Sequence, residues 1–158
     1  IQSSGDYRNP PPRGEHAGLH EFQRDRIHKE VHIGRSERAV IGREIVGHLQ
    51  TEGYRMLAIA VTKVHAHLLV ELPGNLDQVK TIIGDAKRRS SRAVKQSMPG
   101  SVWAAGGTYK RVLELSHRQN ALKYILYGQG SDAWTWSYRD GRLDGEFGRC
   151  EANMRCTE

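Results

Sequence analysis

Apolar and polar positions alternate along this chain with the periods of short strands and amphipathic helices. Weak alternation over residues 25–33 predicts a first strand. Apolar residues at helical spacing follow Ser36, a residue type typical of helix N-caps, and predict a helix that ends at Gly53. Apolar runs over residues 54–61 and 65–72 flank a short turn, so the sequence predicts an antiparallel hairpin there.

The second half of the chain contains two further helices and one further strand. Residues 76–96 carry an apolar stripe at helical spacing, and residues 108–115 have the pattern of a strand. Ser116 is placed to cap a last helix that ends at Tyr127. The resulting order of elements predicts an α+β, ferredoxin-like fold. In that fold a four-stranded antiparallel sheet packs against two helices, its other face is free, and a tyrosine-bearing helix is added at the C-terminal end.

The length of 158 residues suits one domain with one sizeable core. Prolines and glycines are frequent in residues 1–20 and predict a flexible N-terminal segment. The folded domain is expected over residues 21–138, followed by a tail over residues 139–158. No apolar run approaches the roughly 20 residues of a membrane helix, so no membrane partner is expected. Cys150 and Cys156 are too few for a disulfide framework, and they read as reduced thiols of a cytoplasmic protein.

One predicted strand contains two histidines. His65 and His67 are two residues apart, so they project from the same face of the strand, about 7 Å from each other. The other face receives a core-type row of apolar side chains, namely Val64, Ala66, Leu68 and Val70. Two imidazoles on one face can share one divalent cation. A half-buried strand with two exposed or hydrogen-bonded histidines shows the same pattern, so the residues alone leave both interpretations open.

The net charge of +6 and the pI of about 9.5 favour a polyanionic partner. The stretch over residues 80–111 carries a charge of +7, because eight basic residues there oppose one acidic residue, Asp85. The eight are Lys80, Lys87, Arg88, Arg89, Arg92, Lys95, Lys110 and Arg111. A solvated helix face is the usual reason for a run of charge, but this excess favours phosphate binding. The sequence therefore predicts these eight residues as nucleic-acid-binding residues.

Two tyrosines lie outside the apolar stripe of the last predicted helix. The stripe consists of Ala121, Leu122, Ile125 and Leu126. At 100° per residue, Tyr124 is about 130° from its centre and Tyr127 is nearly opposite it. A phenol beside a metal-bound phosphate can act as a nucleophile and form a covalent phosphotyrosine. An amphipathic tyrosine at the edge of a core is the commoner role.

These features together resemble a known family. His65-Ala66-His67 resembles the HUH motif, in which U is a hydrophobic residue. Four further features are similar to single-tyrosine HUH transposases, including the REP-associated tyrosine transposases. They are the basic helix with residues 87–92, the pair Val102-Trp103, a following strand and the Tyr-Ile pair at Tyr124. The resemblance covers residues 25–138.

The resemblance implies a site. The tyrosine of the Tyr-Ile pair is the nucleophile in this family, which implies Tyr124, with Tyr127 as the competing position. His65 and His67 would hold one Mg²⁺ or Mn²⁺. Some members have a glutamine four residues after the tyrosine as third ligand. Gly128 occupies that position here, so Gln129, one residue further on, is the implied ligand.

The resemblance also implies an activity. The protein would be a metal-dependent single-stranded DNA endonuclease and strand transferase, transposase-like, that acts on single-stranded or hairpin DNA through a 5′-phosphotyrosine intermediate. It would be nucleoid-associated in the cytoplasm and serve DNA recombination. Both a homodimer and a monomer occur with this chemistry, and the sequence does not choose between them. Trp103, Tyr109 and Trp134 are candidates to stack on bases or, equally, to anchor the core or the tail.

Two other functions remain open from the residues. A ferredoxin-like sheet with a basic helix could be a non-catalytic module that binds single-stranded nucleic acid. Alternatively, a metal held by His65 and His67 could activate water for hydrolysis, which would leave no covalent protein–DNA adduct.

Overall fold

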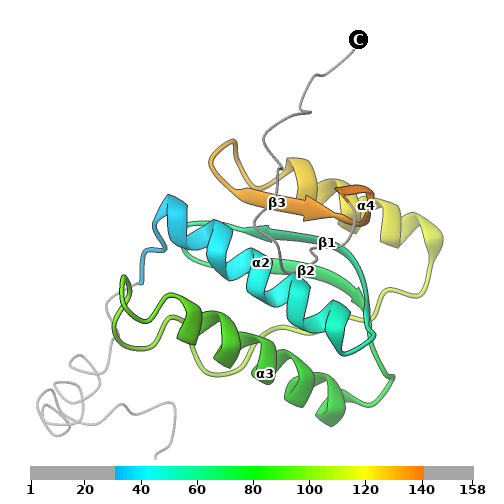
Figure 1. Ribbon diagram of the computed structural model, residues 1–158. Helices are drawn as coiled ribbons and strands as arrows, with labels where there is room; N and C mark the ends of the chain where they lie inside the picture. The colour runs from blue at the N-terminus through cyan, green and yellow to red at the C-terminus, as the bar shows by residue number, and fades with distance from the viewer. Residues whose placement is uncertain (1–30, 141–158) are drawn as a thin grey trace, which may run out of the picture. The chain divides into compact units, whose positions relative to one another are not determined.

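The computed structural model describes residues 31–140 (Figure 1). The described residues from His32 onward belong to one compact unit. They form an α+β fold with three helices, a three-stranded antiparallel sheet and one short 3-10 helix. In chain order the elements are α2 (Arg35–Thr51), β1 (Arg55–Val61), β2 (Ala66–Glu71), α3 (Leu76–Ala93), α4 (Leu115–Tyr127), β3 (Trp134–Ser137) and η1 (Tyr138–Asp140).

The sheet has the order β2-β1-β3, with β1 in the centre and antiparallel to both neighbours. The predicted hairpin is confirmed, because β1 pairs with β2 in a register that sets Ala60 opposite His67. On the other side, β1 pairs with β3, so that Val61 is opposite Trp134. Every residue of β1 after Arg55 is buried, which is the pattern of a strand covered on both faces.

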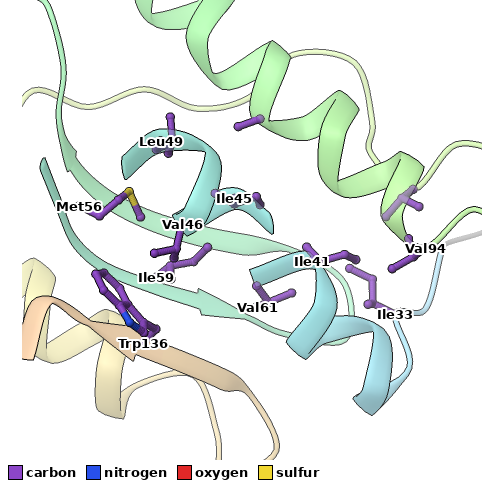
Figure 2. Close-up of a cluster of buried hydrophobic side chains, with 12 residues drawn as sticks. Ile33, Ile41, Ile45, Val46, Leu49, Met56, Ile59, Val61, Val94 and Trp136 are labelled. Atoms are coloured by element: carbon purple, nitrogen blue, oxygen red, sulfur yellow. The ribbon is translucent and has the colours of Figure 1, made fainter. Parts of the chain in front are cut away.

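The two faces of the sheet are covered by different helices (Figure 1). On one face, side chains from α2 and α3 enclose Ile59 and Val61 of β1, together with Trp136 of β3 (Figure 2). On the other face, Ile125 of α4 packs against Ala60 and its neighbours. The prediction that one sheet face is free is therefore wrong, since β1 offers apolar side chains to both sides.

The predicted strand over residues 108–115 is also wrong, because these residues have no regular structure before α4 begins. Only Val112 in this stretch packs into an apolar cluster, and Leu113 is 84% exposed. The free edge of β1 is taken instead by β3, which falls inside the predicted domain but was not predicted as a strand. Non-local strand pairing thus outweighs the local pattern of residues 108–115.

The first predicted strand falls mostly outside the described residues. Its last members are extended chain, and the Ile33 N–H donates to the Lys63 carbonyl at 2.7 Å. The predicted flexible segment over residues 1–20 also lies outside the described part, as does the tail beyond Asp140. The three predicted helices are present, but α2 is capped by Gly34 and α4 by Glu114, each two residues before the predicted serine.

Candidate active site

The two histidines lie at the start of β2, immediately after the turn from β1. His67 faces the α4 side of the sheet, because it is paired with Ala60, whose side chain packs against that helix. The alternate residues Ala66, Leu68 and Val70 pack into the opposite cluster, so the predicted alternation of faces is confirmed for them. The prediction is wrong for Val64, which precedes β2 and is 41% exposed. The backbone at His65 is held by the Thr62 hydroxyl, which accepts the His65 N–H at 3.1 Å and donates to its carbonyl at 3.0 Å.

Tyr124 reaches the same place from α4. The rings of His65 and His67 are edge-to-face, with centroids 4.6 Å apart. The Tyr124 ring in turn meets His67 edge-to-face at 5.4 Å. Ile125 is buried beneath α4 and anchors the helix on the sheet, while Tyr124 beside it is 57% exposed. The structure therefore brings an accessible phenol next to a pair of imidazoles that is far from it in the sequence.

His67 has the electrostatics of a neutral metal ligand. Its Nε2 atom is buried and has no hydrogen-bond partner among residues 31–140. Burial lowers the pKa of His67, and the charge of His65 lowers it further. A depressed pKa keeps the imidazole in the unprotonated form that can bind a cation. Buried polar atoms are normally paired, so this nitrogen calls for an explanation.

The donor set fits a transition metal better than Mg²⁺. Imidazole suits zinc, iron, nickel and copper, whereas Mg²⁺ and Mn²⁺ prefer oxygen ligands. Two nitrogens make an incomplete set, and no cluster of three or more His, Cys, Asp or Glu side chains that could hold a metal occurs in the described part of the chain. Any ion bound here would therefore complete its coordination with water or with substrate oxygens.

The competing tyrosine and the implied third ligand lie at the end of α4. Tyr127 is 81% exposed. The side-chain amide of Gln129 donates to the Tyr124 carbonyl at 3.2 Å, and the Gly128 N–H donates to the same carbonyl at 2.9 Å. Gln129 thus helps to end the helix just after Tyr124, and its role as a metal ligand stays a prediction.

The predicted basic residues are divided between partnered and unpartnered side chains. Arg88 forms an ion pair with Asp85, and Arg111 donates to the Gly74 carbonyl at 2.9 Å. The Lys87 ammonium donates to two backbone carbonyls of the loop after α3, at 2.8 Å each, and burial lowers its pKa. The other five basic residues form no ion pair with another described residue. They are Lys80, Arg89, Arg92, Lys95 and Lys110. Most of this charge lies on α3, across the sheet from Tyr124 (Figure 1).

Two of the candidate base-stacking residues serve the core. The Trp103 indole N–H donates to the buried Ser90 hydroxyl at 3.0 Å, and its ring packs against the α2–α3 cluster. The ring of Trp134 lies against the backbone of α2 at Gly42, so closely that a Cβ at Gly42 would collide with it. Of the two roles left open for these tryptophans, anchoring is the one that their contacts match.

One residue near the site was missed by sequence reasoning. Arg38 on α2 is only 7% exposed, and its Nε donates to the Ile33 carbonyl at 2.9 Å. Its Nη1 donates to the carbonyl of Asp132 at 2.7 Å and to the carboxylate at 2.9 Å. Asp132 lies in the loop that follows the tyrosine helix, so Arg38 fixes that loop. Arg38 is three residues before Ile41 and therefore on the buried side of α2, and this spacing could have indicated its burial.

Comparison of the chain with protein-family models, curated proteins and solved structures finds no match. The fold and the site define an α+β protein with a histidine pair and an accessible tyrosine on adjacent elements. Among the described residues, no helix is long and apolar enough to span a membrane.

Proposed function

We propose that this protein is a metal-dependent nuclease and strand transferase for single-stranded or hairpin DNA, of the HUH single-tyrosine type. The observation that carries the proposal is the edge-to-face contact between His67 and Tyr124, 5.4 Å between ring centroids. It joins the motif on β2 to the Tyr-Ile pair on α4, and the Nε2 atom of His67 has no other partner among the described residues. The sheet of residues 31–140 has three strands, whereas the proposed class has four.

The reaction is a transfer of a phosphoryl group to tyrosine. The Tyr124 hydroxyl gives its proton to water as its oxygen attacks the scissile phosphorus, the new bond joins this oxygen to phosphorus, and the bond from phosphorus to the 3′-oxygen breaks. The 3′-oxygen leaves as a hydroxyl after taking up a proton, and the 5′ end stays on Tyr124 as a phosphotyrosine. Attack by the 3′-hydroxyl of another strand reverses these steps, so joining needs no ATP.

The chain's own residues position the phenol and the phosphate. Tyr124 is 57% exposed although its ring contacts His67, so a DNA strand can reach it without unfolding the helix. His65 and His67 would hold a divalent cation, which when bound neutralises charge on the scissile phosphate. The Thr62 hydroxyl and the pairing of His67 with Ala60 keep the two imidazoles on the α4 side of the sheet.

A covalent-adduct assay tests the proposal. The protein is incubated with Mn²⁺ and a pool of labelled hairpin-bearing single-stranded oligonucleotides, and the products are separated on a denaturing gel. We expect a protein–DNA adduct that is lost in Tyr124→Phe and retained in Tyr127→Phe. The two variants make the same chemical change one helical turn apart, so each is the control for the other.

The other outcomes are equally informative. An adduct lost only in Tyr127→Phe would keep the activity and move the nucleophile. Metal-dependent cleavage with no adduct would indicate hydrolysis by activated water instead. Oligonucleotide binding with neither cleavage nor adduct would favour the non-catalytic nucleic-acid-binding module.

A further inference from the structure

A second group of exposed aromatic and basic side chains lies beside the candidate site. Tyr127 follows Tyr124 by one helical turn and is 81% exposed, and Tyr138, at the start of η1, is 46% exposed. Neither ring belongs to an apolar cluster of the described residues. With Arg118 on α4 and Arg139 on η1, they form what we call the tyrosine–arginine surface.

The topology places these residues together. Strand β3 runs antiparallel to β1 with Ser137 opposite Ala58, so η1 follows close to the start of β1. Helix α4 packs across β1 and β3 on the sheet face opposite α2. Arg118, in the first half of α4, is within electrostatic range of Tyr138, and Tyr127, in its last turn, is within range of Arg139. The surface is on the tyrosine side of the sheet, whereas the predicted basic helix α3 is on the other (Figure 1).

The surface is electropositive around its tyrosines. The Arg139 guanidinium lies 5.8 Å from the centre of the Tyr138 ring, and its Nε donates to the phenol oxygen at 3.4 Å. This hydrogen bond lowers the pKa of Tyr138, and the charges of Arg55 and Arg118 lower it further. Arg55 also forms an ion pair with Glu71 at 3.2 Å. Arg118 and Arg139 have no carboxylate partner within residues 31–140.

We propose that the tyrosine–arginine surface binds the single-stranded DNA adjoining the scissile phosphate, with Tyr127 and Tyr138 stacking on bases and Arg118 and Arg139 binding phosphates. The choice of DNA rests on the proposed function. The chemistry favours a single strand, because exposed phenol rings can stack only on bases whose faces are not already covered in a duplex. Guanidinium groups supply the backbone contacts that such sequence-tolerant binding requires.

Fluorescence anisotropy tests the surface without any cleavage. The probe is a labelled single strand of about 16 nucleotides, the upper site size of single-strand-binding folds, and the full-length protein is titrated in EDTA. Tyr138→Ala removes the stacking ring, while its control Tyr138→Phe keeps it. Tyr127→Ala changes a side chain that is 81% exposed, which protects the comparison against a folding defect.

We expect Tyr138→Ala and Tyr127→Ala each to raise Kd about 5-fold or more, from the loss of one stacked base, and Tyr138→Phe to stay near wild type. The double variant Arg118→Ala/Arg139→Ala should lower the slope of log Kd against log salt by about 1.4, at about 0.7 per phosphate contact. The matched control is Arg35→Ala/Arg43→Ala, which removes two exposed charges from α2 and should leave the slope unchanged.

Four results would overturn the proposal. The first is wild-type binding by both tyrosine-to-alanine variants, and the second is an equal loss of affinity in the two arginine double variants. The third is competition by the matching duplex as strong as that by the single strand. The fourth is equally strong competition by polyglutamate, which would indicate an acidic-peptide surface. The two proposals also fail separately. Loss of binding in Tyr138→Ala without an adduct from any substrate would reject the nuclease and keep this surface. Adduct formation with normal binding by every variant would keep the nuclease and reject this surface.

Discussion

Gly42→Ala tests how α2 meets β3. Gly42 is buried in α2, and a Cβ added there would collide with three carbons of the Trp134 ring. Neither the helix backbone nor a large, half-buried ring packed against the core moves easily, so we expect an overpacking cost of about 1–3 kcal/mol. Alanine is a better helix former than glycine by about 1 kcal/mol, which offsets part of that cost. The net free energy of unfolding should fall by up to about 2 kcal/mol.

Gly47→Ala is the matched control, because Gly47 is in the same helix and an added Cβ there would meet nothing within 4 Å. It should raise the free energy of unfolding by about 0.5–1 kcal/mol. Urea denaturation followed by circular dichroism measures both variants. The difference between them removes the helix-propensity contribution and leaves the cost of the contact with Trp134. If Gly42→Ala proved as stable as Gly47→Ala, the packing of β3 against α2 described above would be wrong.

Three further predictions concern other parts of the molecule. Asp132→Ala leaves Arg38 without its carboxylate and should lower the free energy of unfolding by about 1.5–3 kcal/mol in urea denaturation, with a smaller loss in Asp132→Asn, which keeps an acceptor oxygen. His67→Ala should weaken Mn²⁺ binding, measured by electron paramagnetic resonance of the free ion, whereas His48→Ala on α2 should leave it unchanged. Chelation with EDTA should abolish the covalent adduct but leave anisotropy-detected binding of single-stranded DNA, so loss of both together would contradict the separation of the metal site from the DNA surface.

Local pattern was a reliable guide where an element packs through its own periodic face. The alternation around His67 predicted which residues of β2 share a face, and the stripe containing Ile125 predicted which side of α4 is apolar. Strand pairing was predicted less well, because the four residues of β3 become a strand through contacts with β1 rather than through their own pattern. The stretch around Val112 has a strand-like pattern but pairs with none of the three strands.

The site itself could be assembled only in part from the sequence. The histidine pair was recognisable from spacing, but its contact with Tyr124 depends on α4 crossing the sheet face that had been expected to stay free. Arg38 was missed because a single arginine beside apolar positions gives no sign of which distant carbonyls it will bind.

Ile33 connects the two halves of the site through Arg38. The Ile33 N–H donates to the Lys63 carbonyl, in the turn just before His65, and the Ile33 carbonyl accepts from Arg38. Arg38 also donates to Asp132, in the loop after α4. We therefore expect the turn before the histidines and the loop that follows the tyrosine to open together. Local unfolding of the turn or of the loop should then expose the amides of both. Amide hydrogen exchange in the two segments should therefore change together when the Arg38 guanidinium is altered.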